Sequence, residues 1–121
     1  MILAIEPEAR VIADQDKLLR VLVNGIQNAI HAMGSEGRLE IKAMRRGRWT
    51  EIRIEDTGPG IGEAEQSRVF TPFYTTKADG TGLGLAYSLK VTEGMGGTIQ
   101  LLNHEERAGA VLSIRLPGER A

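Results

Sequence analysis

The chain has 121 residues, which suits a single domain built around one hydrophobic core. Its 15 basic and 16 acidic side chains leave a net charge of −1, so we expect contact with neither nucleic acid nor an anionic membrane. The absence of cysteine excludes disulfides, thiolate metal sites and cysteine nucleophiles, and together with the lack of a bilayer-length apolar run it predicts a cytoplasmic domain, whose parent protein can be membrane-bound.

Two strand-like runs open the chain, at residues 2–5 and 10–13, and a helix follows them. Asp14 or Asp16 can cap this helix, which we expect to run to about Met33 and to end at one of the glycines that follow. The apolar positions of the helix recur at steps of three and four, as in a helix that lies on a sheet. These positions are Leu18, Leu19, Leu22, Ile26, Ala29, Ile30 and Met33.

The middle of the chain predicts a hairpin, a tight turn and a short helix. Residues 38–44 and 50–56 each alternate apolar and polar side chains, as in two paired strands, and the link over residues 45–48 is typical of a solvent-exposed hairpin turn. Residues 56–60, with two glycines and a proline, must form a turn. A short helix is predicted from about residue 63 to 69.

The last third begins with an irregular, threonine-rich stretch over residues 70–80, which is a candidate for a lid. A helix is predicted over residues 82–93, and residues 98–102 and 110–116 predict a second hairpin. Together these elements predict one α/β domain over residues 1–121. We expect a two-layer α/β sandwich, with a mixed or antiparallel sheet of about five strands covered on one face by about three helices.

The first helix carries a polar stripe made of Asn24, Asn28 and His31, which lies opposite the apolar stripe at 100° per residue. Periodicity alone favours a solvated helix face, because most polar stripes are no more than that. Asparagine is nevertheless a poor helix former, and its amide oxygen suits Mg²⁺ when phosphates supply the remaining charge. The other histidine, His104, lies in a polar turn, where we expect it to be solvated.

Asp56 ends its strand on the same side as Ile52 and Ile54, so it points to the core face. A carboxylate there is costly unless it is paired. The sequence around Asp56 favours two roles of this carboxylate equally. Asp56 can accept a hydrogen bond from the exocyclic amine of adenine, with Gly58 and Gly60 letting the backbone approach the base, or it can cap its own turn.

A glycine-rich segment over residues 80–85 opens the second long helix. Backbone amides at such a helix start can bind phosphate through their N–H groups and the helix dipole. The segment has no Gly-Lys-Ser/Thr sequence, which excludes a P-loop, and no strand directly precedes it, which excludes a dinucleotide-binding fold. Lys77 lies just upstream, where it can reach terminal phosphates or be one more surface lysine.

Taken together and in this order, these segments resemble the GHKL ATPase superfamily, and specifically the catalytic ATP-binding domain of sensor histidine kinases. The resemblance covers nearly the whole chain. It rests on residues 24–29 as the N box, 56–61 as the G1 box, 70–77 as the F box and 80–85 as the G2 box. It implies the GHKL fold, ATP and Mg²⁺ as ligands, and a lid over about residues 70–81. The sequence Thr75-Thr76-Lys77 is similar to that of the nitrogen-regulation type of kinase.

The resemblance also implies the site residues. Asn28 would coordinate Mg²⁺ with support from Asn24, and Asp56 would bind the adenine amine. The complete implied ATP site is Asn24, Asn28, His31, Asp56, Gly58, Gly60, Ile61, Phe70, Thr75, Thr76, Lys77, Gly80, Thr81, Gly82, Leu83, Gly84 and Leu85.

Two positions depart from the family pattern. Ala32 stands where many relatives place a tyrosine that packs on adenine, so His31 or another group must cover the base. Gly109-Ala110 stands where relatives often have Gly-Thr, which puts a contact from that strand to adenine in question, although Ala110 should still face inward.

The function implied by the resemblance is transfer of the γ-phosphate of ATP to a histidine on a separate dimerisation domain, and from there indirectly to a response regulator. No arrangement of serine, histidine and acid can be argued from this chain, so the phosphoryl acceptor is expected elsewhere. Three rivals remain: a serine kinase of the anti-sigma type, an ATP-gated clamp like gyrase, and a module that binds no nucleotide. The clamp needs a glutamate in the N-box helix, and no acid lies between Asp16 and Glu36.

Overall fold

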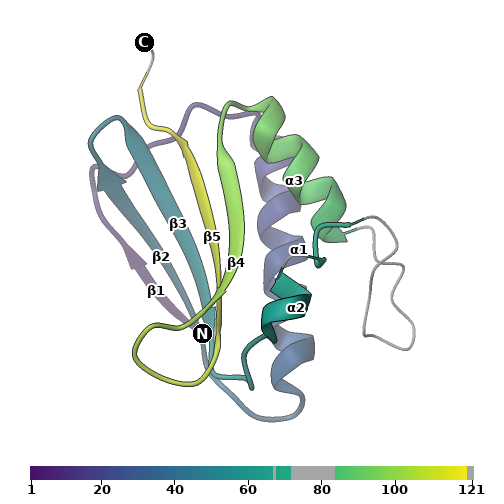
Figure 1. Cartoon of the computed structure of the whole chain (residues 1–121). Helices are drawn as coiled ribbons and strands as arrows, with labels where there is room; N and C mark the ends of the chain where they lie inside the picture. The colour runs from purple at the N-terminus through teal and green to yellow at the C-terminus, as the bar shows by residue number, and fades with distance from the viewer. Residues whose placement is uncertain (67, 72–83, 120–121) are drawn as a thin grey trace.

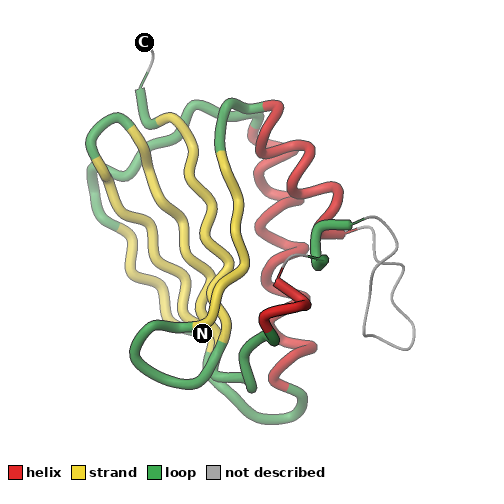
Figure 2. The backbone as a smooth tube through the Cα atoms, in the orientation of Figure 1, coloured by secondary structure: helices red, strands yellow, loops and turns green. Residues whose placement is uncertain are grey.

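The computed structural model describes residues 1–66, 68–71 and 84–119. Within these residues five strands form one mixed sheet and three helices lie together on one of its faces, which confirms the predicted fold class (Figures 1 and 2). The elements in chain order are β1 (Ile2–Ile5), α1 (Gln15–Met33), β2 (Leu39–Arg46), β3 (Trp49–Asp56), α2 (Glu63–Gln66), α3 (Gly84–Gly94), β4 (Thr98–Asn103) and β5 (Ala110–Pro117).

The strands lie in the order β1-β2-β3-β5-β4. The two predicted hairpins are confirmed, because β2 pairs with β3 and β4 pairs with β5 in antiparallel fashion. The hairpins meet through the antiparallel pair of β3 and β5. Only β1 is parallel to its neighbour, β2, because α1 connects the two strands and brings the chain back to the same end of the sheet. The sheet is therefore mixed.

Helix α1 begins and ends where the sequence predicts. Its cap, Asp14, accepts a hydrogen bond from the N–H of Lys17 at 3.0 Å, and Gly34 ends the helix with a φ of 71°. The predicted apolar stripe is wrong at two positions, since Leu19 and Ile30 are 59% and 52% exposed. The buried side is centred on Val21, Gly25 and Ala29. Positions 19 and 30 are turned about 120–140° from Gly25 around the helix, which takes them away from the sheet.

The core lies between α1, α3 and the inner face of the sheet, where the side chains of Ile54, Ile114 and Leu116 are almost completely buried. Gly25 allows α1 to lie close to this face. A Cβ atom built on Gly25 would be 2.7 Å from Cδ2 of Leu112 and 2.8 Å from Cδ1 of Ile54. Alanine at this position would therefore require the ends of these two side chains, which come from two different strands, to shift.

Residues 10–13 do not form the strand that their apolar sequence predicts. They run across the ends of β3 and β5, where the Ile12 N–H donates to the Pro117 carbonyl at 2.7 Å and the Thr50 hydroxyl donates to the Arg10 carbonyl. The segment is held by isolated hydrogen bonds because it crosses the strand ends on its way to α1 and has no strand alongside to pair with.

Two other predicted boundaries differ from the structure. The short helix ends at Gln66 rather than near residue 69, and residues 68–70 continue in turns. The link between β2 and β3 is only Gly47 and Arg48, because β2 extends to Arg46; the φ of 63° at Gly47 suits a two-residue hairpin. The described part of α3 begins at Gly84, so its predicted start at residue 82 lies outside the described residues.

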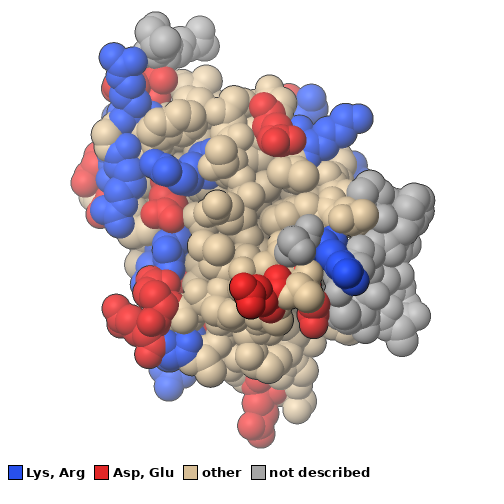
Figure 3. Space-filling model, in the orientation of Figure 1, with Lys and Arg blue, Asp and Glu red and all other residues tan. Residues whose placement is uncertain are grey.

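Charged side chains of both signs are interspersed on the face shown in Figure 3, and they gather over the strands while the centre of the view is mostly uncharged. In the part of the chain that the structure covers, no helix combines the length and the apolar character needed to cross a bilayer.

Candidate functional site

A cavity of about 570 Å³ lies between α1, the loop that follows β3, α2 and the inner face of the sheet. This volume is typical of a site for a small molecule or a nucleotide. Six predicted site residues line the cavity and come from three separate motifs. They are Asn28, His31, Asp56, Gly60, Ile61 and Leu85.

The inner wall of the cavity is apolar. It is formed by side chains of β3, β4 and β5 that face the helices, namely Ile54, Leu101 and Leu112, together with Ala29 of α1. Ala110 is 8% exposed and also lines the cavity, so the prediction that it faces inward is confirmed. A flat, apolar ring fits such a wall, and the few polar groups nearby can fix its orientation.

Asp56 is the buried polar group of this wall, with 4% of its surface exposed. Its Oδ1 atom accepts hydrogen bonds from the N–H of Gly58 at 2.9 Å and from the N–H of Ala110 at 3.0 Å. Its Oδ2 atom has no hydrogen-bond partner among the residues that the structure describes. The turn-capping interpretation therefore holds for one oxygen, and it leaves the second oxygen able to accept from a ligand N–H group.

The loop after β3 is fixed by a side chain that the sequence did not single out. Asn103, at the end of β4, accepts from the N–H of Ile61 at 2.8 Å and donates to the Ile61 carbonyl at 2.9 Å. Gly60 has a φ of 86°, and a Cβ atom there would lie 2.5 Å from Oδ1 of Asn103. Gly58 does not line the cavity and acts within the Asp56 turn. Asn103 was missed because its partner lies 42 residues away.

The polar stripe of α1 is only in part the solvated face that periodicity favours. Asn24 and Asn28 are half-buried, because α3 and the cavity flank this side of the helix. The side-chain amide of Asn24 donates to the Gly84 carbonyl at 3.3 Å and so ties α1 to the first residue of α3. His31 is exposed and lies at the cavity wall beside Ala32.

Asn28 is the predicted ligand for Mg²⁺, and it is one of the residues that line the cavity. Among the residues with described positions, no group of three histidine, cysteine or acidic side chains could hold a metal ion. A single neutral amide fits Mg²⁺ only if a bound phosphate and water supply the other oxygens. The donor set therefore fits a metal ion that arrives with a nucleotide.

Several predicted residues are not placed in the cavity. Phe70 is half-buried and packs against the core, but it does not line the cavity. The positions of Thr75, Thr76, Lys77, Gly80, Thr81, Gly82 and Leu83 lie outside the described residues, as does most of the predicted lid.

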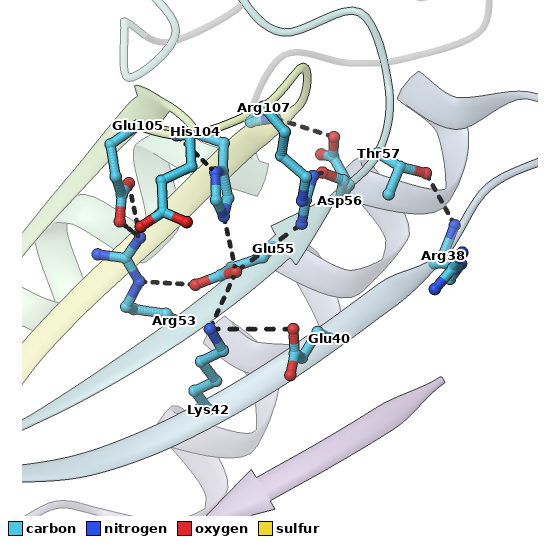
Figure 4. Close-up of polar contacts among 12 residues, drawn as sticks. Arg38, Glu40, Lys42, Arg53, Glu55, Asp56, Thr57, His104, Glu105 and Arg107 are labelled. Carbon is cyan, nitrogen blue, oxygen red and sulfur yellow. Dashed lines mark hydrogen bonds and ion pairs between the residues drawn. The ribbon is translucent and has the colours of Figure 1, made fainter.

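On the opposite face of the sheet, directly behind Asp56, lies a cluster of charged side chains around Glu55 (Figure 4). The Glu55 side chain is only 1% exposed, and its carboxylate lies 2.8 Å from Nε of Arg53 and 3.4 Å from Nζ of Lys42. Burial alone would raise the pKa of Glu55, but the hydrogen bond from Arg53 and the charges of Lys42 and Arg53 hold that pKa below its ordinary value.

The loop between β4 and β5 covers this cluster. Nε2 of His104 lies 3.2 Å from Oε1 of Glu55, so the prediction of a solvated His104 is wrong. Nη2 of Arg107 lies 3.8 Å from the same oxygen, and Nη1 of Arg107 donates to the Asp56 carbonyl at 2.7 Å. A strand pattern predicts only that Glu55 points away from the core, and the loop that buries it is about 50 residues further along.

Comparison with known proteins agrees with this geometry. The family described as histidine kinase-, DNA gyrase B- and HSP90-like ATPases matches residues 13–120. The chain belongs to this family. Within the family, the ATPase domain is similar to histidine kinases: it is 42% identical over 105 residues to the sensor histidine kinase ZraS of Escherichia coli, covering 87% of this chain and 22% of ZraS.

Solved structures place the domain in the same group. The catalytic domain of the histidine kinase ThkA superposes with a TM-score of 0.85 at 34% identity, over 97% of this chain and 78% of that one. Full-length ShkA in complex with AMPPNP superposes with a TM-score of 0.80 at 27% identity, over 99% of this chain and 26% of that one. ThkA has also been solved in complex with the response regulator protein TrrA. The chain therefore corresponds to the ATPase domain of a sensor histidine kinase and spans about a fifth of the length of ZraS.

Proposed function

We propose that this domain binds Mg-ATP and presents the γ-phosphate to a histidine on a separate dimerisation domain. The observation that carries the proposal is the Asp56 carboxylate, which is buried at the end of an apolar wall. Two backbone N–H groups hold Oδ1, while Oδ2 has no hydrogen bond within the described structure. A carboxylate oxygen without a protein partner, on a residue that lines the cavity, favours a ligand that donates an N–H group, as the exocyclic amine of adenine does.

The other site residues take roles consistent with their places. Ile61 and Leu85, with the apolar wall, would enclose the base. Asn28 would contribute an oxygen to Mg²⁺, which neutralises charge on the phosphates when bound, and Asn24 would hold the start of α3. His31 lies where it could cover the base in place of the missing aromatic side chain. The contacts predicted for residues 70–83 with the phosphates, and the lid over about residues 70–81, remain predictions.

Phosphoryl transfer needs little covalent help from the protein, since positioning and charge neutralisation do most of the catalysis. We therefore assign no nucleophile to this chain. The partners we propose are the histidine-bearing domain of the same kinase and, indirectly, a response regulator, as expected of a protein that resembles ThkA. We also propose that residues 1–121 form one domain that acts in the cytoplasm without contacting nucleic acid or membrane.

The test is calorimetric titration of the chain with Mg²⁺ and a non-hydrolysable ATP analogue. The Asp56→Asn variant should bind about 10–100 times more weakly, which corresponds to the loss of a charge-assisted hydrogen bond. Asp16→Asn makes the same change at an exposed position in the first turn of α1, and it should bind like the parent. Failure of the parent to bind, or equal binding by Asp56→Asn, would overturn the proposal.

A second experiment tests the acceptor. Mixing the domain and Mg-ATP with a helical hairpin that carries the acceptor histidine of its own kinase should yield an acid-labile phosphohistidine. An acid-stable phosphoserine would refute the assignment and favour the anti-sigma type of kinase.

A further inference from the structure

The loop between β4 and β5 reaches back over the end of β3, next to the candidate adenine site. We use the name β4–β5 loop for residues 103–109, which are the last residue of β4 and the turn that follows it. Two of its side chains hold the segment from Asp56 to Ile61, and neither of them lines the cavity. They contact the back of the segment whose front faces the ligand space.

Asn103 forms the first contact. Its side-chain amide bonds both the N–H and the carbonyl of Ile61, at 2.8 Å and 2.9 Å, in the way that a neighbouring strand would pair with that residue. Ile61 and Gly60 line the cavity, so the pairing fixes the backbone of one cavity wall. No backbone–backbone hydrogen bond to Ile61 is found in the described structure, which leaves Asn103 as the partner of both main-chain groups.

Arg107 forms the second contact. Its Nη1 atom donates to the Asp56 carbonyl at 2.7 Å, and Nη2 lies 3.8 Å from the buried carboxylate of Glu55. Gly109 lets the loop come this close, since a Cβ atom there would be 2.0 Å from the Asp56 carbonyl oxygen. The main chain of Asp56 is thus held from behind by Arg107, while its side chain is held by the N–H groups of Gly58 and Ala110.

We propose that Asn103 and Arg107 are positioning residues for base recognition, which set the place of the Asp56 carboxylate and of the Gly60–Ile61 wall without touching the nucleotide. The inference rests on the proposed function, since it assumes that Asp56 reads the exocyclic amine of adenine. A carboxylate accepts from this amine and repels the carbonyl oxygen that guanine has in its place. Displacement of Asp56 should therefore reduce the preference for adenine more than it reduces binding of nucleotide phosphates.

The experiment measures dissociation constants of ADP and of GDP with Mg²⁺ by calorimetry on the 121-residue chain. Asn103→Ala removes both bonds to Ile61, and Arg107→Lys keeps the positive charge near Glu55 but removes the guanidinium geometry. Each variant should bind ADP about 5–30 times more weakly. Binding of GDP should change much less, so that the ratio of the two constants falls at least about threefold.

Two control variants are available. Glu106→Ala changes an exposed side chain of the same loop that has no hydrogen bond or ion pair within the described structure. Arg48→Ala removes an arginine whose side chain is 77% exposed at the far end of the sheet. Both should keep the parent's ratio, and circular dichroism and thermal melts of all four variants separate an altered site from a partly unfolded protein.

The two proposals fail in different ways. A parent chain that does not bind ADP in preference to GDP overturns the proposed function and this inference with it. A selective parent, together with an Asn103→Ala or Arg107→Lys variant that keeps the parent's ratio, overturns the positioning role alone. A folded variant that loses ADP and GDP binding equally also overturns the positioning role, because displacement of Asp56 should weaken ADP binding more than GDP binding.

Discussion

Replacing Gly25 with alanine puts a methyl group where α1 lies closest to the sheet. The new Cβ atom would be 2.7 Å from Cδ2 of Leu112 and 2.8 Å from Cδ1 of Ile54, well inside van der Waals contact. Both of these side chains belong to the packed core. Overpacking of a core by one methyl group costs about 1–3 kcal/mol, and alanine regains about 1 kcal/mol over glycine in a helix interior.

The free energy of unfolding should therefore fall by about 1 kcal/mol, within a range of about 0–2 kcal/mol. For a domain of this size, that lowers the melting temperature by about 3–5 °C. The matched control is Gly94→Ala, because a Cβ atom at Gly94, the last residue of α3, meets no described atom within 4 Å. This control should leave stability unchanged or raise it by a few tenths of a kcal/mol.

Leu112 and Ile54 also line the cavity, so the cavity offers space into which their side chains can move. If the two side chains rotate into the cavity, stability is partly restored and the ATP analogue binds more weakly. Thermal melts and calorimetry should therefore be performed on the same samples of Gly25→Ala. A variant as stable as Gly94→Ala, with the parent's nucleotide affinity, would refute the close-packing argument.

Three further predictions concern stability. Gly109→Ala should lower the free energy of unfolding by more than about 2 kcal/mol in urea titrations, because a Cβ atom there lies 2.0 Å from the Asp56 carbonyl oxygen at a φ of 130°. Gly47→Ala should cost only about 1 kcal/mol, because a Cβ atom there meets no described atom within 4 Å, although the φ is 63°. Since the pKa of Glu55 is lowered in the folded state, its contribution to stability is present above the ordinary value of 4.5 and is lost as the pH falls through the folded pKa. In the Glu55→Gln variant, the free energy of unfolding from urea titrations should depend less on pH as the pH is lowered from 7 through the folded pKa of Glu55. An unchanged pH dependence would contradict the stabilising role of the ion-pair cluster. Thr92→Val should raise the melting temperature, because the buried Thr92 hydroxyl has no hydrogen-bond partner among the residues that the structure describes, and a lower melting temperature would contradict this reasoning.

Local patterns predicted the parts of the fold that depend on neighbouring residues. The cap at Asp14 and the end of α1 at Gly34 follow from short-range hydrogen bonds and from glycine's access to positive φ. The alternation along β3 also placed Asp56 on the core face, since side-chain direction in a strand depends only on position. The sequence could therefore identify the central residue of the candidate site.

The sequence failed where contacts depend on long-range packing. Residues 10–13 have the apolar character of a strand, but strand formation also needs a partner, and the segment crosses the strand ends instead. His104 and Arg107 look solvated in a polar turn until the turn is folded over Glu55. The same argument applies to Asn24, whose partner on α3 is 60 residues away. In each case the sequence pattern involves neighbouring residues, whereas the contact joins residues that are far apart in the sequence.

The cavity and the hydrophobic core share a wall, formed in part by Ala29, Ile54 and Leu112. A larger apolar side chain on this wall would fill empty space and make the fold more stable, and the same change would close the site. Selection for stability and selection for nucleotide binding therefore oppose each other at these three positions. Variants chosen only for heat resistance should accumulate larger residues here and lose their ligand, so these positions report whether a related sequence still needs the site.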